Sequence, residues 1–196
     1  MTLTAGVIAV QGDVSEHVAA LERSATACGV DLTVQRVRTA GTVPSCDMLV
    51  LPGGESTTIS DLLVTEKIAS EIVGHVEAGN PLLATCAGLI VVSRDPRDER
   101  VHTLDCLDIS VDRNAFGRQR DSFEAPLPIR GLERPFPAVF IRAPLIDSVG
   151  PSVEVLAAWE DRPVAVRSGS VVATSFHPEL THDSRLHELA LFEQFS

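Results

Sequence analysis

Short apolar runs rich in β-branched residues alternate with helix-patterned segments through the first half of the chain, and this alternation constrains the fold most strongly. The runs that predict buried strands are residues 3–10, 32–37, 48–51 and 81–85. Helices are expected after Asp13 or Ser15, after Ser56 or Thr57, and over residues 66–78 and 87–92. This strand–helix–strand order predicts a parallel sheet with helices on both faces.

The second half of the chain has a different pattern. Short strands are expected over residues 107–111, 136–141, 153–159, 164–167 and 171–176, followed by a helix over 184–195. Tight turns at 160–162 and 168–169 favour antiparallel hairpins added to the parallel core. The charged run at 94–100 is interpreted as a solvated loop. The whole pattern predicts a flavodoxin-like α/β fold, with a mainly parallel, mixed sheet flanked by helices, in one domain over residues 1–196.

Composition excludes several classes of protein. The formal net charge is −11, so nucleic acid and anionic membrane surfaces would repel the chain. No apolar run of about 18 residues predicts a membrane span, and the first residues lack a signal-peptide pattern. The cysteines, at positions 28, 46, 86 and 106, show neither a disulfide framework nor zinc-site spacing. We therefore expect a reduced, cytoplasmic protein with no metal site.

Cys86 lies between a predicted strand end and a helix start, among small neighbours in Leu83-Ala-Thr-Cys-Ala-Gly88. This is the setting of a nucleophile elbow, which exposes its side chain at the carboxyl edge of the sheet. A helix N-terminus favours a thiolate, and the Ala87 N–H can face a developing oxyanion. A buried structural cysteine is the alternative interpretation.

His177-Pro178-Glu179 follows the last predicted strand. Residues two apart in an extended segment point to the same side, so Glu179 can bond one nitrogen of His177 while the other faces a thiol. The alternative is an ordinary surface turn.

Two glycines, Gly53 and Gly54, follow the predicted strand at 48–51. They allow close backbone approach, and their N–H groups can supply a second oxyanion donor. A phosphate-binding turn is the alternative, although the segment lacks the Gly-Lys-Ser/Thr of a P-loop.

Taken together, these motifs resemble the class I, triad-type glutamine amidotransferases, and among them the PdxT/SNO family, the glutaminase subunits of pyridoxal 5′-phosphate synthases. The matching segments are Gln11-Gly12 with Glu16-His17, Leu51-Pro-Gly-Gly-Glu-Ser-Thr57, Thr85-Cys-Ala-Gly88, Arg113-Asn-Ala-Phe-Gly-Arg-Gln119 with Asp121-Ser-Phe-Glu124, Val139-Phe-Ile-Arg-Ala-Pro144, and Ser175-Phe-His-Pro-Glu-Leu-Thr181. Ala84 departs from the pattern, because the family usually has glycine there.

The resemblance implies that the chain hydrolyses L-glutamine to glutamate and ammonia without a cofactor. Cys86 would be the nucleophile, His177 the acid and base, and Glu179 the residue that orients His177. The residues implied to hold glutamine are Gly53, Gly54, Glu55, Ser56, Arg113, Ile141 and Arg142, with Gly54 and Ala87 at the oxyanion. From the residues alone, a surface ion pair remains an alternative role for each arginine.

The resemblance also implies a partner, the barrel-fold, PdxS-type synthase subunit, in a large hetero-oligomer that receives the ammonia. Gln11, Glu16 and His17 would lie near that interface. A loop cap for Gln11 and a place in the first helical turn for Glu16 are the local alternatives.

Two other functions stay open from sequence. The chain could be the glutaminase of another ammonia-channelling pathway, or a catalytically silent binding subunit on the same fold. The remaining histidines, at positions 75, 102, 182 and 187, are expected on solvated faces with no role.

Overall fold

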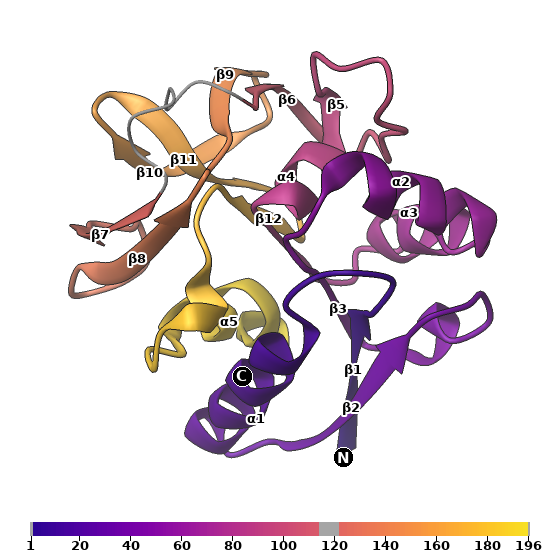
Figure 1. Cartoon of the computed structure of the whole chain (residues 1–196). Helices are drawn as coiled ribbons and strands as arrows, with labels where there is room; N and C mark the ends of the chain where they lie inside the picture. The colour runs from indigo at the N-terminus through magenta and orange to yellow at the C-terminus, as the bar shows by residue number, and fades with distance from the viewer. Residues whose placement is uncertain (1, 114–121, 196) are drawn as a thin grey trace.

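A computed structural model describes residues 2–113 and 122–195 of the chain (Figure 1). The strands are β1 (Thr2–Ile8), β2 (Asp31–Val37), β3 (Met48–Leu51), β4 (Leu82–Thr85), β5 (Ser93–Asp95), β6 (Leu107–Asp112), β7 (Ser122–Leu127), β8 (Phe136–Ile141), β9 (Leu145–Val149), β10 (Glu154–Trp159), β11 (Arg162–Ser168) and β12 (Val171–Thr174). The α-helices are α1 (Val14–Cys28), α2 (Ser56–Thr65), α3 (Ala69–Glu77), α4 (Ala87–Val92) and α5 (Arg185–His187). The shorter helical turns are η1 (Val43–Ser45), η2 (Pro178–Leu180), η3 (Glu188–Phe192) and η4 (Glu193–Phe195).

The main sheet has seven strands in the order β10-β11-β12-β4-β3-β1-β2. Every neighbouring pair from β12 to β2 is parallel, whereas β10–β11 and β11–β12 are antiparallel. The predicted mixed α/β architecture is confirmed. Parallel strands share a carboxyl edge, so the loops after β1, β3, β4 and β12 meet on one side of the sheet.

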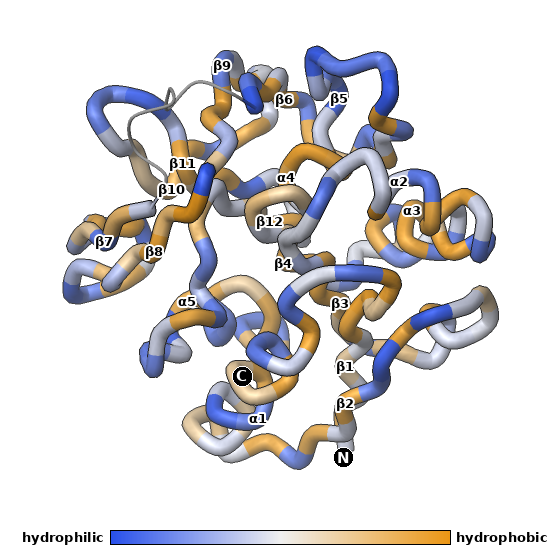
Figure 2. Tube along the Cα trace, viewed as in Figure 1, coloured by the Kyte–Doolittle hydropathy of each residue, from blue (hydrophilic) through white to orange (hydrophobic). Residues whose placement is uncertain are grey.

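Successive residues of the central strands pack on opposite faces of the sheet, as the two-residue strand period requires. Met48 and Val50 enter the core that contains α1 and α5, and Leu49 and Leu51 enter the core that contains α2, α3 and α4. Figure 1 shows the same two helical layers, and Figure 2 shows the apolar central strands between them. Burial on both faces explains why these strands are apolar at every position.

Two of the later predicted strands lie outside the main sheet. β6 pairs with β5 and β9 in a separate three-stranded sheet, and β8 pairs with β7 in a hairpin. The partner strands β5, β7 and β9 were not predicted. Their sequences contain Asp, Ser, Glu and Pro, which disfavour strands, so only the tertiary pairing identifies them.

Several predicted element ends also differ. Glu55, rather than Ser56 or Thr57, caps α2, because its carboxylate accepts from the Thr58 N–H at 2.9 Å. The helix expected from residue 66 begins at Ala69, since Lys67 has a left-handed φ of 59°. The helix expected over 184–195 is α5 followed by the π turn η3 and the 3-10 turn η4.

Gly29 ends α1 in the left-handed conformation, as expected. Within the described residues, we find no helix with the length and apolar character needed to cross a membrane.

Candidate active site

Cys86 stands at the sharp turn between β4 and α4. Its φ of 50° and ψ of −107° are strained for a non-glycine residue, as a nucleophile elbow requires. Its backbone N–H donates to the Thr174 carbonyl at 2.8 Å, which fixes the turn against β12. A Cβ at Gly88 would lie 2.3 Å from the Leu51 carbonyl oxygen, so α4 packs too closely on β3 for a larger residue. Ala84, in β4, is accommodated, because its methyl group packs in the core that contains α2, α3 and α4.

His177 and Glu179 form the predicted pair. His177 Nδ1 lies 2.7 Å from Glu179 Oε1, and both side chains are buried. The predicted extended segment is wrong, because Pro178–Leu180 is a 3-10 turn that brings the carboxylate under the ring. The backbone N–H of His177 donates to the Val139 carbonyl at 2.8 Å, which fixes this loop against β8.

The electrostatics of this group favour the protonated form of His177. Burial opposes the charge on His177, but hydrogen bonds to Cys86 and Glu179 outweigh it and raise the pKa of His177 to about 10. Burial raises the pKa of Glu179, and the bond to His177 acts against that rise. Because Nδ1 is bonded to Glu179, Nε2 is left for the Cys86 thiol. The arrangement can therefore carry a proton between a sulfur nucleophile and a leaving group.

The Gly53–Gly54 turn lies directly against this pair. A Cβ at Gly53 would lie 2.8 Å from His177 Cε1 and 3.2 Å from Cys86 Cβ. On its other side the turn packs on the loop after β1, where a Cβ at Gly12 would lie 1.8 Å from the Gly53 carbonyl oxygen. Gln11 Oε1 accepts from the Glu55 N–H at 2.8 Å. The Gln11 side chain therefore fixes the position of the Gly53–Gly54 turn.

A cavity of about 810 Å³ opens above Cys86. Its walls include all but one of the residues expected to bind glutamine, together with Cys86, Ala87 and His177: Gly54, Glu55, Ser56, Arg113, Ile141 and Arg142. The exception is Gly53, which lies against His177 and Cys86. The Ser56 hydroxyl is buried at the cavity wall with no hydrogen-bond partner in the described part of the chain. An unpaired buried donor at a cavity is typical of a ligand-binding position.

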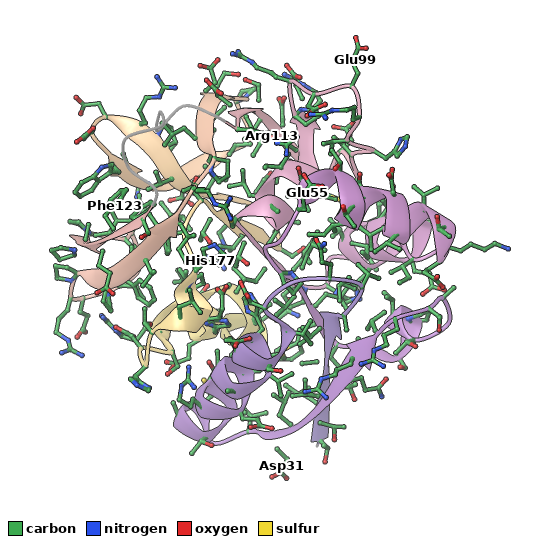
Figure 3. All side chains as sticks on the ribbon, viewed as in Figure 1. Asp31, Glu55, Glu99, Arg113, Phe123 and His177 are labelled. Carbon is green, nitrogen blue, oxygen red and sulfur yellow. The ribbon has the colours of Figure 1, made fainter. Side chains whose placement is uncertain are left out.

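Charged side chains meet at the cavity wall. Arg113 Nη2 lies 3.0 Å from Glu55 Oε1, and Nη1 binds Asp98. Figure 3 shows Glu55 and Arg113 side by side, with His177 near the centre of the molecule. Hydrogen bonds from Thr57 and Thr58 lower the pKa of Glu55 to about 2, so it is a carboxylate at neutral pH.

The interpretation of residues 94–100 as a solvated loop is therefore wrong in part. Asp98 is half-buried and holds Arg113, and Pro96, Arg97 and Arg100 also line the cavity. Part of this charged run lines a polar cavity. Composition alone does not distinguish a charged segment of a cavity wall from a solvated surface loop. The family-specific segment at 114–121 lies outside the described residues.

The structure buries three histidines outside the His177–Glu179 pair, and it corrects the expectation for two of them, His75 and His187. His17 is fully buried, so its side chain offers no surface to a partner, whereas Glu16 is exposed. His75 and His187 were expected on solvated faces, but both are buried. His75 bonds the Pro81 carbonyl oxygen at 3.1 Å, and His187 packs against His17. His102 and His182 are exposed, as expected.

Asp13 is a cavity residue that sequence reasoning treated only as a helix cap. Its Oδ2 lies 3.6 Å from His177 Nδ1. In residues 2–113 and 122–195, Asp13, His177 and Glu179 form one group whose ligand atoms lie within 4.8 Å of one another. The bond between His177 and Glu179 already uses two of these atoms, so a metal ion would have to break it.

Comparisons with known proteins agree with this geometry. Residues 7–195 match the model of the SNO glutamine amidotransferase family. A relative from Halobacterium salinarum called "Pyridoxal 5'-phosphate synthase subunit PdxT" is 69% identical and covers 99% of this chain and 96% of its own. A relative of the same name from Methanosarcina barkeri is 50% identical and covers 97% of each chain.

Solved structures give the same result for the fold. One described as "Crystal structure of glutamine amidotransferase" superposes with a TM-score of 0.86 at 44% identity over 95% of this chain and 96% of the other. The structure of PurLQS from Thermotoga maritima superposes with a TM-score of 0.68 at 16% identity over the full length of both chains, which shows a shared fold.

Proposed function

Because this chain belongs to the SNO glutamine amidotransferase family, we propose that it is the glutaminase subunit of a pyridoxal 5′-phosphate synthase. Relatives that carry that name match almost the whole chain, and the fold is that of a glutamine amidotransferase. The reaction is the hydrolysis of the glutamine side-chain amide to glutamate and ammonia. Residues 1–196 act as one glutaminase domain.

The observation that carries this proposal is the position of Cys86, at a strained elbow and in the same cavity wall as His177, whose ring is bonded to the buried Glu179. The Cys86 thiol gives its proton to His177 as its sulfur attacks the amide carbon, and the carbonyl oxygen becomes an oxyanion that accepts from the Gly54 and Ala87 N–H groups. His177 gives its proton to the nitrogen, the C–N bond breaks, and ammonia leaves a γ-glutamyl thioester. His177 then takes a proton from water, whose oxygen attacks the thioester. The C–S bond breaks, glutamate leaves, and His177 returns the proton to the Cys86 sulfur. Glu179 holds His177 in place through both steps.

The cavity wall supplies the contacts that glutamine requires. The Arg113 guanidinium suits the α-carboxylate, because its planar fork pairs both oxygens. The Glu55 carboxylate suits the α-ammonium, and the unpaired Ser56 hydroxyl supplies a further donor. Gly53 and Gly54 form the turn beside the reacting amide, and Ile141 and Arg142 also line the cavity.

Free ammonia is lost to water unless a second active site receives it, so the partner is a barrel-fold, PdxS-type synthase subunit in a hetero-oligomer. Glu16 is exposed at the start of α1, and the half-buried Gln11 lies beside the Gly53–Gly54 turn. A partner that docks there can act on the backbone N–H groups that bind the oxyanion. The four cysteines are unpaired, which fits a reducing compartment such as the cytoplasm.

The test is release of glutamate from glutamine, measured with and without the synthase subunit. Wild type is active in the complex, and Cys86→Ala loses activity while it still binds the partner. A glutamine-derived affinity reagent labels Cys86 and spares Cys28, Cys46 and Cys106. Labelling of another cysteine, or an active Cys86→Ala variant, contradicts the assignment of the nucleophile.

A further inference from the structure

His17 is a buried polar residue that the proposed reaction does not use. It lies in the first turns of α1 and has no exposed surface. Its Nε2 lies 3.4 Å from Glu179 Oε2 and 3.2 Å from Thr85 Oγ1, and its Nδ1 lies 3.3 Å from His187 Nε2. The ring therefore contacts the carboxylate of the triad, the residue before the nucleophile, and the C-terminal helix at once.

Glu179 needs a donor on the side that faces His17. Its Oε1 is bonded to His177, whereas Oε2 is buried and has no closer hydrogen-bond partner among the described residues. A buried carboxylate oxygen without a donor is costly. The His17 Nε2 is the group placed to supply one, at a distance that a small movement of either side chain converts into a full hydrogen bond.

The neighbouring groups fix the direction of this contact. Burial holds the pKa of His17 well below its usual value, and burial lowers that of His187 to about 3, so both rings are neutral and carry one N–H each. The Nδ1 of His187 is buried without a partner in the described residues, so its proton is best placed on Nε2, where it donates to His17 Nδ1. The His17 proton then lies on Nε2 and points to Glu179 and Thr85. The opposite tautomer would set a lone pair against the carboxylate.

We propose that His17, aligned by His187, is a positioning residue that donates a hydrogen bond to Glu179 Oε2 and so fixes the carboxylate that orients His177. The inference rests on the proposed glutaminase function. It also explains why a histidine of α1 is buried behind the triad rather than presented to a partner.

Two substitutions of similar polarity test this role. The amide nitrogen of His17→Gln reaches the place of Nε2 and retains the donor to Glu179. The amide of His17→Asn reaches only the place of Nδ1, so it contacts His187 but leaves Oε2 unpaired. His75→Leu is the control for the loss of a buried histidine away from the site, because the hydrogen bond that His75 makes among the described residues is to the Pro81 carbonyl oxygen.

The first measurement is glutaminase activity in the complex with the synthase subunit. We expect His17→Asn to lower kcat at least tenfold with KM within twofold of wild type, because no substrate contact is lost. His17→Gln recovers most of kcat, and His75→Leu retains it. Equal rates for the Gln and Asn variants overturn the proposal, because the donor to Oε2 is then irrelevant.

The second measurement does not depend on glutamine. The rate of Cys86 alkylation by iodoacetamide is followed against pH by mass spectrometry of the Cys86 peptide. The charged and titratable groups that face the cluster are Asp13, Arg23, His177, His187 and Glu179 itself. Loss of the donor to Glu179 raises the pKa of this carboxyl further, so the acidic limb of the profile shifts to higher pH in His17→Asn and not in His17→Gln.

These outcomes separate the two proposals. A wild-type protein that fails to hydrolyse glutamine contradicts the proposed function, but the alkylation profiles still test His17. Superimposable profiles for wild type and His17→Asn overturn the positioning role even in an active enzyme.

Discussion

Gly53 is the residue at which a single methyl group should disturb catalysis most directly. It does not have a positive φ, so an alanine there is not opposed by backbone strain. The added Cβ would lie 2.8 Å from His177 Cε1 and 3.2 Å from Cys86 Cβ. Carbon atoms need about 3.4 Å or more, so the His177 ring must move by about 0.6 Å. Because a displacement near 1 Å costs about 100-fold in rate, we expect Gly53→Ala to lower kcat by about 10- to 100-fold.

The same displacement should appear before any substrate binds. His177 moves away from the Cys86 sulfur, so alkylation of Cys86 by iodoacetamide at neutral pH should slow as well. Overpacking should also lower the free energy of unfolding by about 1–3 kcal/mol, measured in urea. The control is Gly74→Ala in α3, where a Cβ meets nothing within 4 Å; it should gain about 0.5–1 kcal/mol of stability and keep full activity. Wild-type kcat and alkylation rate in Gly53→Ala would refute the close packing on which this reasoning depends.

Three other predictions follow from the described contacts. Glu179→Gln removes the charge beside His177, so kcat for glutamate release should fall by about 10²-fold or more. His187→Leu should gain stability relative to wild type as the pH falls below about 6.5, because the neutral His187 of the folded state has a pKa near 3 and the unfolded state takes up its proton first; urea midpoints between pH 4 and 7 measure this, and a constant difference contradicts it. Arg113→Lys loses the planar fork, so KM for glutamine should rise about 10- to 100-fold with little change in kcat; an unchanged KM would indicate that Arg113 serves only its ion pairs with Glu55 and Asp98.

Local patterns predicted the centre of the molecule well. The apolar runs at β3 and β4 are buried on both faces, so their continuous apolar sequence indicates a central place in the sheet. The elbow at Cys86 was recognisable in part because Gly88, two residues after it, is required by the close packing of α4 on β3. Such features depend on residues that are neighbours in sequence.

The parts that sequence reasoning missed depend on distant contacts. His17 and His187 are 170 residues apart, and no local signal distinguishes a buried histidine on a helix from a solvated one. The contact of Asp98 with Arg113 likewise joins residues that are 15 apart in the sequence. The strands β5, β7 and β9 are defined by pairing rather than by composition, and a pattern of single residues does not detect pairing.

The late strand β12 occupies a central place in the sheet, between β4 and β11, and this order has a consequence for synthesis on the ribosome. When β4 leaves the ribosome, the edge that will pair with β12 is bare, and it stays so until residues 171–174 follow. At about 5–20 residues per second this takes roughly 5–20 s, during which an apolar strand edge is open to aggregation or to a chaperone. His177 and Glu179 emerge later still, so a truncated nascent chain cannot release ammonia. The appearance of residues 177–179 is thus the earliest step at which the site of this glutaminase can assemble.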